Sequence, residues 1–141
     1  MQSNAPKHFQ WPVRVYYEDT DSAGVVYYAN YLRYMERART EWLRALGFEQ
    51  ADLEAQHGVG FVVRTVTIDY LQPARLSDAL DISVELLQLG ASQIKLKQVV
   101  TRAGTLLCEA SVRMACVSMT ATTPLKAVRI PRIIIESIQP A

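Results

Sequence analysis

The sequence is poor in the residues from which metal and disulfide sites are built. Its only histidines, His8 and His57, lie far apart, and its only cysteines, Cys108 and Cys116, form no CxxC pair. We therefore expect neither a zinc site nor any other bound metal. The even spacing of the cysteines would place both thiols on one face of a strand, too far apart to bond to each other. This favours two reduced core thiols in a cytoplasmic protein.

Strong charge bias, long apolar runs and nucleotide-binding motifs are also missing. Lys and Arg number 15 against 14 Asp and Glu, a net charge of +1, which gives no general attraction to nucleic acid. No apolar run approaches the roughly 20 residues of a transmembrane helix, and Met1–Gln10 contains no apolar core of an export signal. Neither GxxxxGKS/T nor GxSxG occurs, and Gly58-Val59-Gly60 lacks the third glycine of a dinucleotide loop. We therefore expect no cofactor.

The composition that is present, 50% hydrophobic and 21% charged, is typical of one globular domain, and we expect a single domain over residues 1–141. A helical pattern of apolar residues begins at Asn30, the expected N-cap, and ends before Gly47, the expected C′ residue. The polar stretch Glu49–Gly60 is expected to contain no element. Alternating apolar residues predict five strands, and a proline predicts the first turn of a short closing helix. These strands span Phe9–Tyr17, Phe61–Leu71, Leu80–Leu89, Gln93–Thr101 and Leu106–Met119, and the helix spans Arg132–Ile138.

The order of strand, helix and four strands predicts an α+β fold. Tight turns make neighbouring strands antiparallel, which favours one long central helix packed on a curved antiparallel sheet of about five strands. The apolar arc of the helix covers about half of its circumference and includes Arg39, whose side chain must either reach solvent or pair with a buried acid. Because one helix cannot cover five long strands, the uncovered sheet predicts at least a homodimer.

One segment, residues 16–31 with the sequence YYEDTDSAGVVYYANY, has the composition of a small hydrolytic site. Asp19 and Asp21 lie between a strand and the long helix, where rigid elements hold a loop from both sides. A helix N-terminus has unpaired N–H groups and a partial positive charge, and it can stabilise a developing oxyanion. A carboxylate facing it could attack a carbonyl or activate water, and a thioester suits such a site because a thiolate leaves without a strong acid.

Similar residues also occur in structural turns, in calcium loops and in phosphatases. Asp and Ser in a strand-to-helix turn commonly serve turn formation and helix capping. Residues 19–24 look like the beginning of a calcium loop, but Ala23 and Asn30 stand where two ligands would be needed. The DxD pair is typical of aspartyl-phosphate phosphatases as well, which need a larger parallel sheet than this strand order allows.

Together with later segments, the motif resembles the signature of the hotdog-fold acyl-CoA thioesterases. Residues 16–31, followed by Glu36-Arg37-Ala38-Arg39, are most similar to the Tol–Pal-associated (YbgC-like) branch, with 4-hydroxybenzoyl-CoA thioesterase as a more distant relative. Phe61-Val62-Val63-Arg64 and Pro73-Ala74-Arg75-Leu76 match that branch too. The resemblance implies a hotdog fold in which the sheet wraps the helix, homodimers that pair into homotetramers, and an active site at the dimer interface.

The resemblance also implies roles within the motif. Asp21 would be the catalytic carboxylate, as base or as nucleophile, and Asp19 a structural loop residue. The backbone N–H of Tyr28 would polarise the thioester carbonyl. A histidine often follows the Tyr27 position in the branch, whereas Tyr28 matches the aromatic-CoA relative, so no role of an imidazole carries over.

An acyl-CoA substrate would need an acyl pocket and contacts for its phosphates. Tyr27 and Tyr31 are candidates for the pocket, although aromatic residues at helical spacing also form cores. Arg64 and Lys95 are candidates to meet the phosphates, beside Ser92 in the turn between two strands, although lysines on a strand can equally mark a solvated face. The wider candidate sets add Tyr28, Tyr34 and Trp42 to the pocket and Arg75, Lys97, Lys126 and Arg129 to the phosphate contacts.

The leading prediction is therefore a cytoplasmic acyl-CoA thioesterase that releases a free acid and CoA. An alternative is a non-enzymatic module that binds acyl-CoA or an acyl carrier protein in the same cleft, and an acyl carrier protein is also an expected partner of the enzyme. A hotdog dehydratase or hydratase is a third hypothesis, but it would need a histidine, for which only His57 is available.

Overall fold

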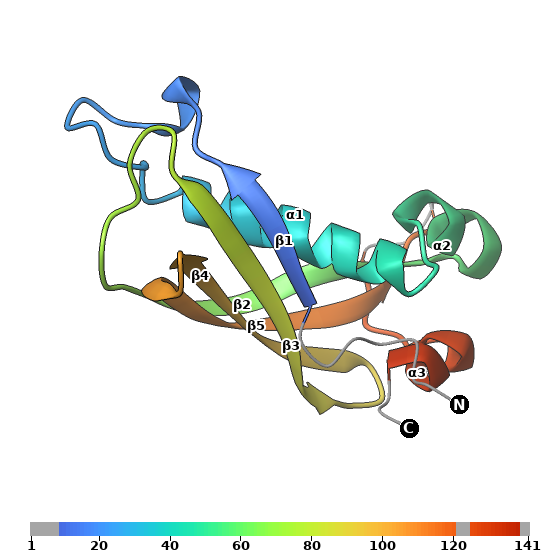
Figure 1. Ribbon diagram of the computed structural model, residues 1–141. Coiled ribbons are helices and arrows are strands. Elements are labelled where there is room, and N and C mark those ends of the chain that lie inside the picture. The colour runs from blue at the N-terminus through green and yellow to red at the C-terminus, as the bar shows by residue number, and fades with distance from the viewer. Residues whose placement is uncertain (1–8, 121–124, 139–141) are drawn as a thin grey trace.

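The structure, a computed structural model shown in Figure 1, describes residues 9–120 and 125–138. The sequence prediction that Met1–Gln10 contains no export signal falls mostly on residues 1–8, which lie outside the described residues. No helix among the described residues is long and apolar enough to cross a membrane. The elements in chain order are β1 (Phe9–Arg14), the 3-10 turn η1 (Tyr17–Asp19), α1 (Asn30–Ala45), α2 (Gln50–His57), β2 (Val59–Tyr70), β3 (Ala79–Leu89), β4 (Gln93–Arg102), β5 (Thr105–Ser118) and α3 (Arg132–Ile138).

The five strands form one antiparallel sheet in the order β1-β3-β4-β5-β2. The long helix α1 lies along one face of this curved sheet, and the short helices α2 and α3 lie beyond its C-terminal end (Figure 1). The predicted α+β class, with one helix packed against a five-stranded antiparallel sheet, is therefore confirmed. The face of the sheet toward α1 is called the inner face below, and the opposite one the outer face.

The core lies between α1 and the inner face. Tyr34, Met35 and Trp42 of α1 are at most 2% exposed. Alternate residues of β4 and β5 are buried against them, as the period-two pattern predicts, because successive side chains of a strand point to opposite faces. The buried inner-face residues of the three middle strands are Leu80, Ile82, Val84, Ile94, Leu96, Gln98, Val100, Cys108, Ala110, Val112, Met114 and Cys116.

Both cysteines are free and buried on the inner face, as predicted. Burial raises the pKa of Cys108 to about 12 and that of Cys116 to about 11. Little thiolate, the reactive form, therefore exists at pH 8. We expect an aromatic disulfide reagent at this pH to leave both thiols of the native protein unmodified and to modify both after unfolding in urea. Fast modification of the native protein would contradict this packing.

The C-terminus of α1 follows the prediction, whereas its N-terminus does not. Gly47 has a φ of +97°, and the Phe48 N–H donates to the Leu43 carbonyl at 2.9 Å, which closes the helix in a Schellman motif. The predicted N-cap is wrong, because Ala29 occupies that position and Asn30 is the first helical residue. The Asn30 side chain turns back toward the preceding loop instead.

The end of β1 and the polar stretch after α1 also differ from the sequence prediction. β1 ends at Arg14 rather than at Tyr17, because the chain bends into η1, and both Tyr16 and Tyr17 are exposed. The stretch expected to contain no element forms α2. Only Leu53 of α2 is buried, so this segment has almost no apolar periodicity by which a helix could be recognised.

The Arg39 side chain pairs with an amide. The sequence had offered two possibilities, that it reaches solvent or that it pairs with a buried acid. Its Nη1 donates to Gln98 Oε1 at 2.9 Å, and Gln98 Nε2 donates to the backbone carbonyls of Met35 and Ser83. Burial lowers the pKa of the Arg39 guanidinium, whose ordinary value lies so far above neutrality that the group stays charged. The buried Gln98 on β4 thus accepts the hydrogen bond of the Arg39 side chain on α1.

The edge strand β2 keeps an apolar row that α1 only partly covers. Its register with β5 places five side chains opposite inward-facing residues of β5, so they share the inner face. Val63 and Tyr70 of this row are 43% and 44% exposed, and within the described residues β2 pairs only with β5. The homodimer prediction rests on this exposed edge. The inner row of β2 consists of Phe61, Val63, Val66, Ile68 and Tyr70.

Candidate active site

The segment between η1 and α1 folds into a small hairpin. The Asp21 N–H donates to the Val25 carbonyl at 2.9 Å, and the Tyr27 N–H donates to the Asp19 carbonyl at 2.9 Å, so the two arms pair with each other. Gly24 closes the turn with a φ of +80°, which glycine adopts without steric cost. This motif hairpin, residues 19–27, leads directly into the N-terminus of α1.

Asp19 and Asn30 attach the motif hairpin to its neighbours. Asp19 Oδ2 accepts a hydrogen bond from the Tyr16 N–H at 2.9 Å. The Asp19 carbonyl accepts one from Asn30 Nδ2 at 2.8 Å in addition to that from the Tyr27 N–H. Asn30 is only 7% exposed, so losing this bond would leave a buried amide unsatisfied at a cost of roughly 1–3 kcal/mol. These hydrogen bonds support the structural loop role that the resemblance implies for Asp19.

Asp21 carries the free carboxylate of the motif hairpin. Its Oδ1 accepts a hydrogen bond from the Ala23 N–H at 2.8 Å, which fixes the side-chain direction. Its Oδ2 has no hydrogen-bond partner among the described residues. The side chain is exposed in the single chain, so any crevice around it needs a surface from outside this chain.

The first turn of α1 presents an unused backbone donor. The N–H groups of Asn30 and Tyr31 donate to the carbonyls of Tyr27 and Tyr28, whereas the Tyr28 N–H donates to no described residue. Because α1 begins at Asn30, the Tyr28 N–H lies at the positive end of the helix dipole. A backbone N–H in this position can donate to an anion or to a developing oxyanion.

A small aromatic pocket adjoins this donor. The rings of Tyr27 and Tyr28 are 4.8 Å apart, and Tyr70 packs edge-on against Tyr28 at 6.2 Å. The Tyr70 hydroxyl also donates to the Tyr28 carbonyl at 3.3 Å. Tyr70 was not among the residues predicted for the site. The sequence shows only that Tyr70 lies in a strand, and it does not reveal that the end of β2 lies beside the start of α1. The pocket measures about 250 Å³ and is lined by Val26, Tyr28, Tyr31, Tyr70, Leu71, Gln72 and Pro73.

The aromatic residues further along α1 belong mainly to the core. Tyr31 is 4% exposed, and its hydroxyl accepts a hydrogen bond from the Ala74 N–H at 3.0 Å, although its ring borders the pocket. The Tyr34 hydroxyl is buried without a hydrogen-bond partner among the described residues. Burial, and after it the Asp19 carboxylate, raises the pKa of Tyr34, so this phenol stays protonated. Trp42 is 2% exposed.

The remaining predicted substrate-binding residues lie at a distance from the motif hairpin. Arg64 and Lys95 lie near each other, on strands β2 and β4 that flank Arg113 of β5. Ser92 lies in the turn before β4, where its carbonyl accepts a hydrogen bond from the Cys116 N–H. β3 begins beside the motif hairpin and ends at this turn, and at ~3.4 Å per residue its 11 residues separate Ser92 from the hairpin by roughly 30 Å. Within a single chain these residues therefore lie in two separate regions. Asp21, Tyr27, Tyr28 and Tyr31 lie in the motif hairpin and the start of α1, and Arg64, Ser92 and Lys95 lie toward the other end of the sheet.

Known proteins are similar to this chain over most of its length. A family model described as "Thioesterase-like superfamily" matches residues 15–139. The acyl-CoA thioester hydrolase YbgC of Escherichia coli O6:H1 is 51% identical over 110 residues, which are 77% of this chain and 81% of that protein. The acyl-CoA thioesterase YbgC of Haemophilus influenzae is 44% identical over 117 residues, 83% of this chain and 86% of its own.

The fold can be compared with a solved structure as well. A 4-hydroxybenzoyl-CoA thioesterase, crystallised as an aspartate-to-asparagine mutant with 4-hydroxybenzoyl-CoA, superposes with a TM-score of 0.88. The superposition covers 95% of this chain and 100% of that one, at 19% sequence identity. The predicted hotdog fold is therefore confirmed.

Proposed function

This chain belongs to the thioesterase-like superfamily and is an acyl-CoA thioester hydrolase, and we propose that Asp21 and the backbone N–H of Tyr28 carry out its reaction. One observation carries the proposal: the unused Tyr28 N–H stands at the start of α1, and the hairpin that precedes it holds Asp21 by hydrogen bonds on both arms. The dehydratase or hydratase hypothesis is less well supported, because within one chain His57 ends α2, which lies beyond the end of α1 that is far from the motif hairpin (Figure 1).

The proposed reaction places the thioester between these two groups. The Asp21 carboxylate either takes a proton from water that attacks the carbonyl carbon, or attacks it directly to form an anhydride that water then cleaves. In either route the carbonyl oxygen becomes an oxyanion that accepts a hydrogen bond from the Tyr28 N–H. Collapse of this intermediate breaks the carbon–sulfur bond. The thiolate takes up a proton, and the products are a free acid and CoA.

Release of thiol is the direct test of this activity. The wild-type protein should liberate one thiol for each acid formed from at least one member of a panel of short, long and aromatic acyl-CoAs. Saturable binding of the whole panel without thiol release would instead support the non-enzymatic module. Acyl carrier protein loaded with the preferred acyl group tests in the same assay whether it is a second donor, and the free cysteines favour a cytoplasmic location for the reaction.

We further propose that the working enzyme is a homodimer, or a homotetramer built from such dimers, with the active site completed across the interface. Three observations support this: Asp21 is exposed in one chain, the edge of β2 is free within the described residues, and the inner row of β2 is apolar and partly exposed. A second copy would pair with the edge, cover the inner row and close a crevice around the carboxylate.

A charge placed in the inner row should separate the dimer. We expect Val63→Asp to shift the protein to a monomer and to lower hydrolysis at least about tenfold, because burying an unpaired carboxylate in an interface is strongly unfavourable. Thr67→Asp is the matched control, since Thr67 is exposed on the outer face of the same strand. Light scattering after size-exclusion chromatography measures the mass. A Val63→Asp protein with wild-type mass and activity would contradict the proposed interface.

A further inference from the structure

The outer face of the sheet carries a cationic group that the proposed reaction does not use. Lys95 of β4 and Arg113 of β5 are directly opposite each other in the register. Like charges in opposite positions destabilise a sheet unless something of the other sign lies between them. Neither side chain forms an ion pair with any described residue. We call Arg64, Lys95 and Arg113 the outer cation cluster.

Each of the two strands that flank Lys95 and Arg113 has a β-bulge directly beside this pair, so that all four strands meet in one row across the sheet. In β2 the register passes from Val63 opposite Met114 to Thr65 opposite Arg113, so Arg64 and Thr65 both face Arg113. In β3 the corresponding shift places Leu87 and Gln88 opposite Lys95. Bulges redirect side chains and are common beside functional sites. The bulge in β2 adds a third cation to the row, and at ~4.8 Å per strand Arg64 and Lys95 are roughly 10 Å apart.

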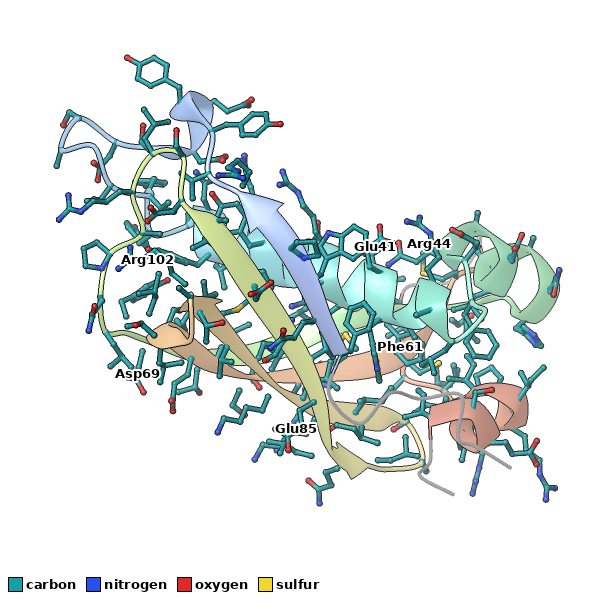
Figure 2. The ribbon with its side chains drawn as sticks, in the orientation of Figure 1. Glu41, Arg44, Phe61, Asp69, Glu85 and Arg102 are labelled. Atoms are coloured by element: carbon teal, nitrogen blue, oxygen red, sulfur yellow. The ribbon has the colours of Figure 1, made fainter. Side chains whose placement is uncertain are left out.

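Acidic residues lie elsewhere on the outer face. Asp69 and Glu109 are directly opposite each other toward the other end of β2 and β5. Figure 2 shows Glu85 on the side of the sheet away from α1, where its register partner is Lys97, and Asp81 shares that face of β3. Lys97 therefore has an acid as its register partner, whereas no acid is a register partner of the outer cation cluster. An anion that approaches this face is directed to the cluster.

A concave site accompanies the charge. Lys95 and Arg113 border a pocket of about 300 Å³ together with Gln88, Leu89, Gly90, Gln93 and Ile94. Gly90 brings backbone without a side chain to the rim of the pocket. The Lys95 ammonium and the Arg113 guanidinium lie on adjacent strands in directly opposite positions. Such groups bind phosphate oxygens well, and Arg can do so through two parallel N–H donors.

We propose that the outer cation cluster is a binding site for an organic phosphate. The cluster lies on the face away from α1, so its phosphate has two possible sources. One is the nucleotide end of an acyl-CoA whose thioester is bound by another protomer, and this source rests on the proposed function. The other is a separate phosphate compound that binds independently of hydrolysis. In both cases the recognising chemistry is the same pair of opposed cations.

The binding test uses adenosine 3′,5′-bisphosphate and inorganic pyrophosphate as probes, titrated calorimetrically into the full-length protein. We expect Lys95→Gln and Arg113→Gln each to weaken binding at least about tenfold, because each removes a charge-assisted hydrogen bond. Arg132→Gln is the matched control, since it removes the same charge from an exposed side chain on α3. Wild-type protein that binds neither probe, or variants that bind as wild type does, would overturn the proposal.

Kinetics separates the two sources. If the phosphate belongs to CoA, both cluster variants should raise KM for acyl-CoA about tenfold while kcat, and all constants for the matching acyl-pantetheine thioester, stay unchanged. If the phosphate belongs to a separate compound, the variants should bind the phosphate probes more weakly, while KM for acyl-CoA and KM for the acyl-pantetheine thioester stay at their wild-type values. If the protein hydrolyses no thioester, the proposed function is refuted, and the probe titration still tests phosphate binding by the outer cation cluster.

If the variants lose self-association but bind the probes as the wild type does, the cluster binds the acidic residues Asp69 and Glu109 of another copy of the chain. That result would overturn the phosphate site.

Discussion

Asp21→Asn should lower thiol release from acyl-CoA at least about a hundredfold while the fold and the molecular mass in solution stay those of the wild type. The amide oxygen of asparagine can still accept the Ala23 N–H, so the motif hairpin keeps its shape. What disappears is the negative charge that would take a proton from water or attack the carbonyl carbon. The loss should fall on kcat, since the substitution leaves the aromatic pocket and its contacts unchanged.

Asp19→Asn is the matched control in the same hairpin. The Asp19 side chain accepts a backbone hydrogen bond from Tyr16, which an asparagine oxygen can also accept. We therefore expect this variant to retain activity within about tenfold of the wild type. Near-normal turnover by Asp21→Asn, or an equal loss in both variants, would refute Asp21 as the reacting carboxylate. Circular dichroism and light scattering on both variants report whether fold and oligomer are retained.

Tyr28→Pro should also abolish most of the activity, because proline has no backbone N–H. The Tyr28 N–H makes no hydrogen bond with a described residue, so the substitution removes no native bond, and proline is tolerated near the first turn of a helix. Removal of one oxyanion donor typically costs a factor of about 10² to 10³ in kcat. We expect a loss of that size for every acyl-CoA that the wild-type protein hydrolyses.

Tyr28→Ala separates the backbone donor from the side chain. This variant keeps the N–H but loses the ring that packs against Tyr27 and Tyr70. It should change KM and acyl preference more than kcat. Equal kcat values for Tyr28→Pro and Tyr28→Ala would show that the ring, and not the N–H, is what the reaction uses at this position. Thermal unfolding of both variants distinguishes a lost donor from a lost helix start.

Much of the fold could be predicted because its periodicity is strong. β4 alternates buried with less buried residues from Gln93 to Val100, β5 does so from Cys108 to Met114, and Gly47 ends α1 where a left-handed residue is required. α2 could not be predicted, because a helix that buries only Leu53 leaves no pattern in the sequence. The role of Asn30 was also hidden, because its partner is a backbone carbonyl 11 residues earlier in the chain.

The sequence offered candidate site residues but not their arrangement. The family resemblance implied roles for Asp21 and Tyr28, which stay predictions, and the hairpin shows how the chain connects the two. In contrast, the adjacency of Lys95 and Arg113 depends on which strands pair and on their register. Arg64 joins them only through a bulge, which adds one residue and shifts every later pairing. The sequence pattern therefore identified two cations of this row and missed the third that lies between them.

The most direct test of the account is a crystal structure of the Asp21→Asn protein with an acyl-CoA bound. We predict that the thioester oxygen lies within about 2.7–3.1 Å of the Tyr28 nitrogen, the distance expected for an oxyanion donor. We also expect the substituted side chain to face the carbonyl carbon, inside a crevice formed with a second copy of the chain. A thioester bound away from the N-terminus of α1, or a position-21 side chain that still faces solvent in the complex, would contradict it.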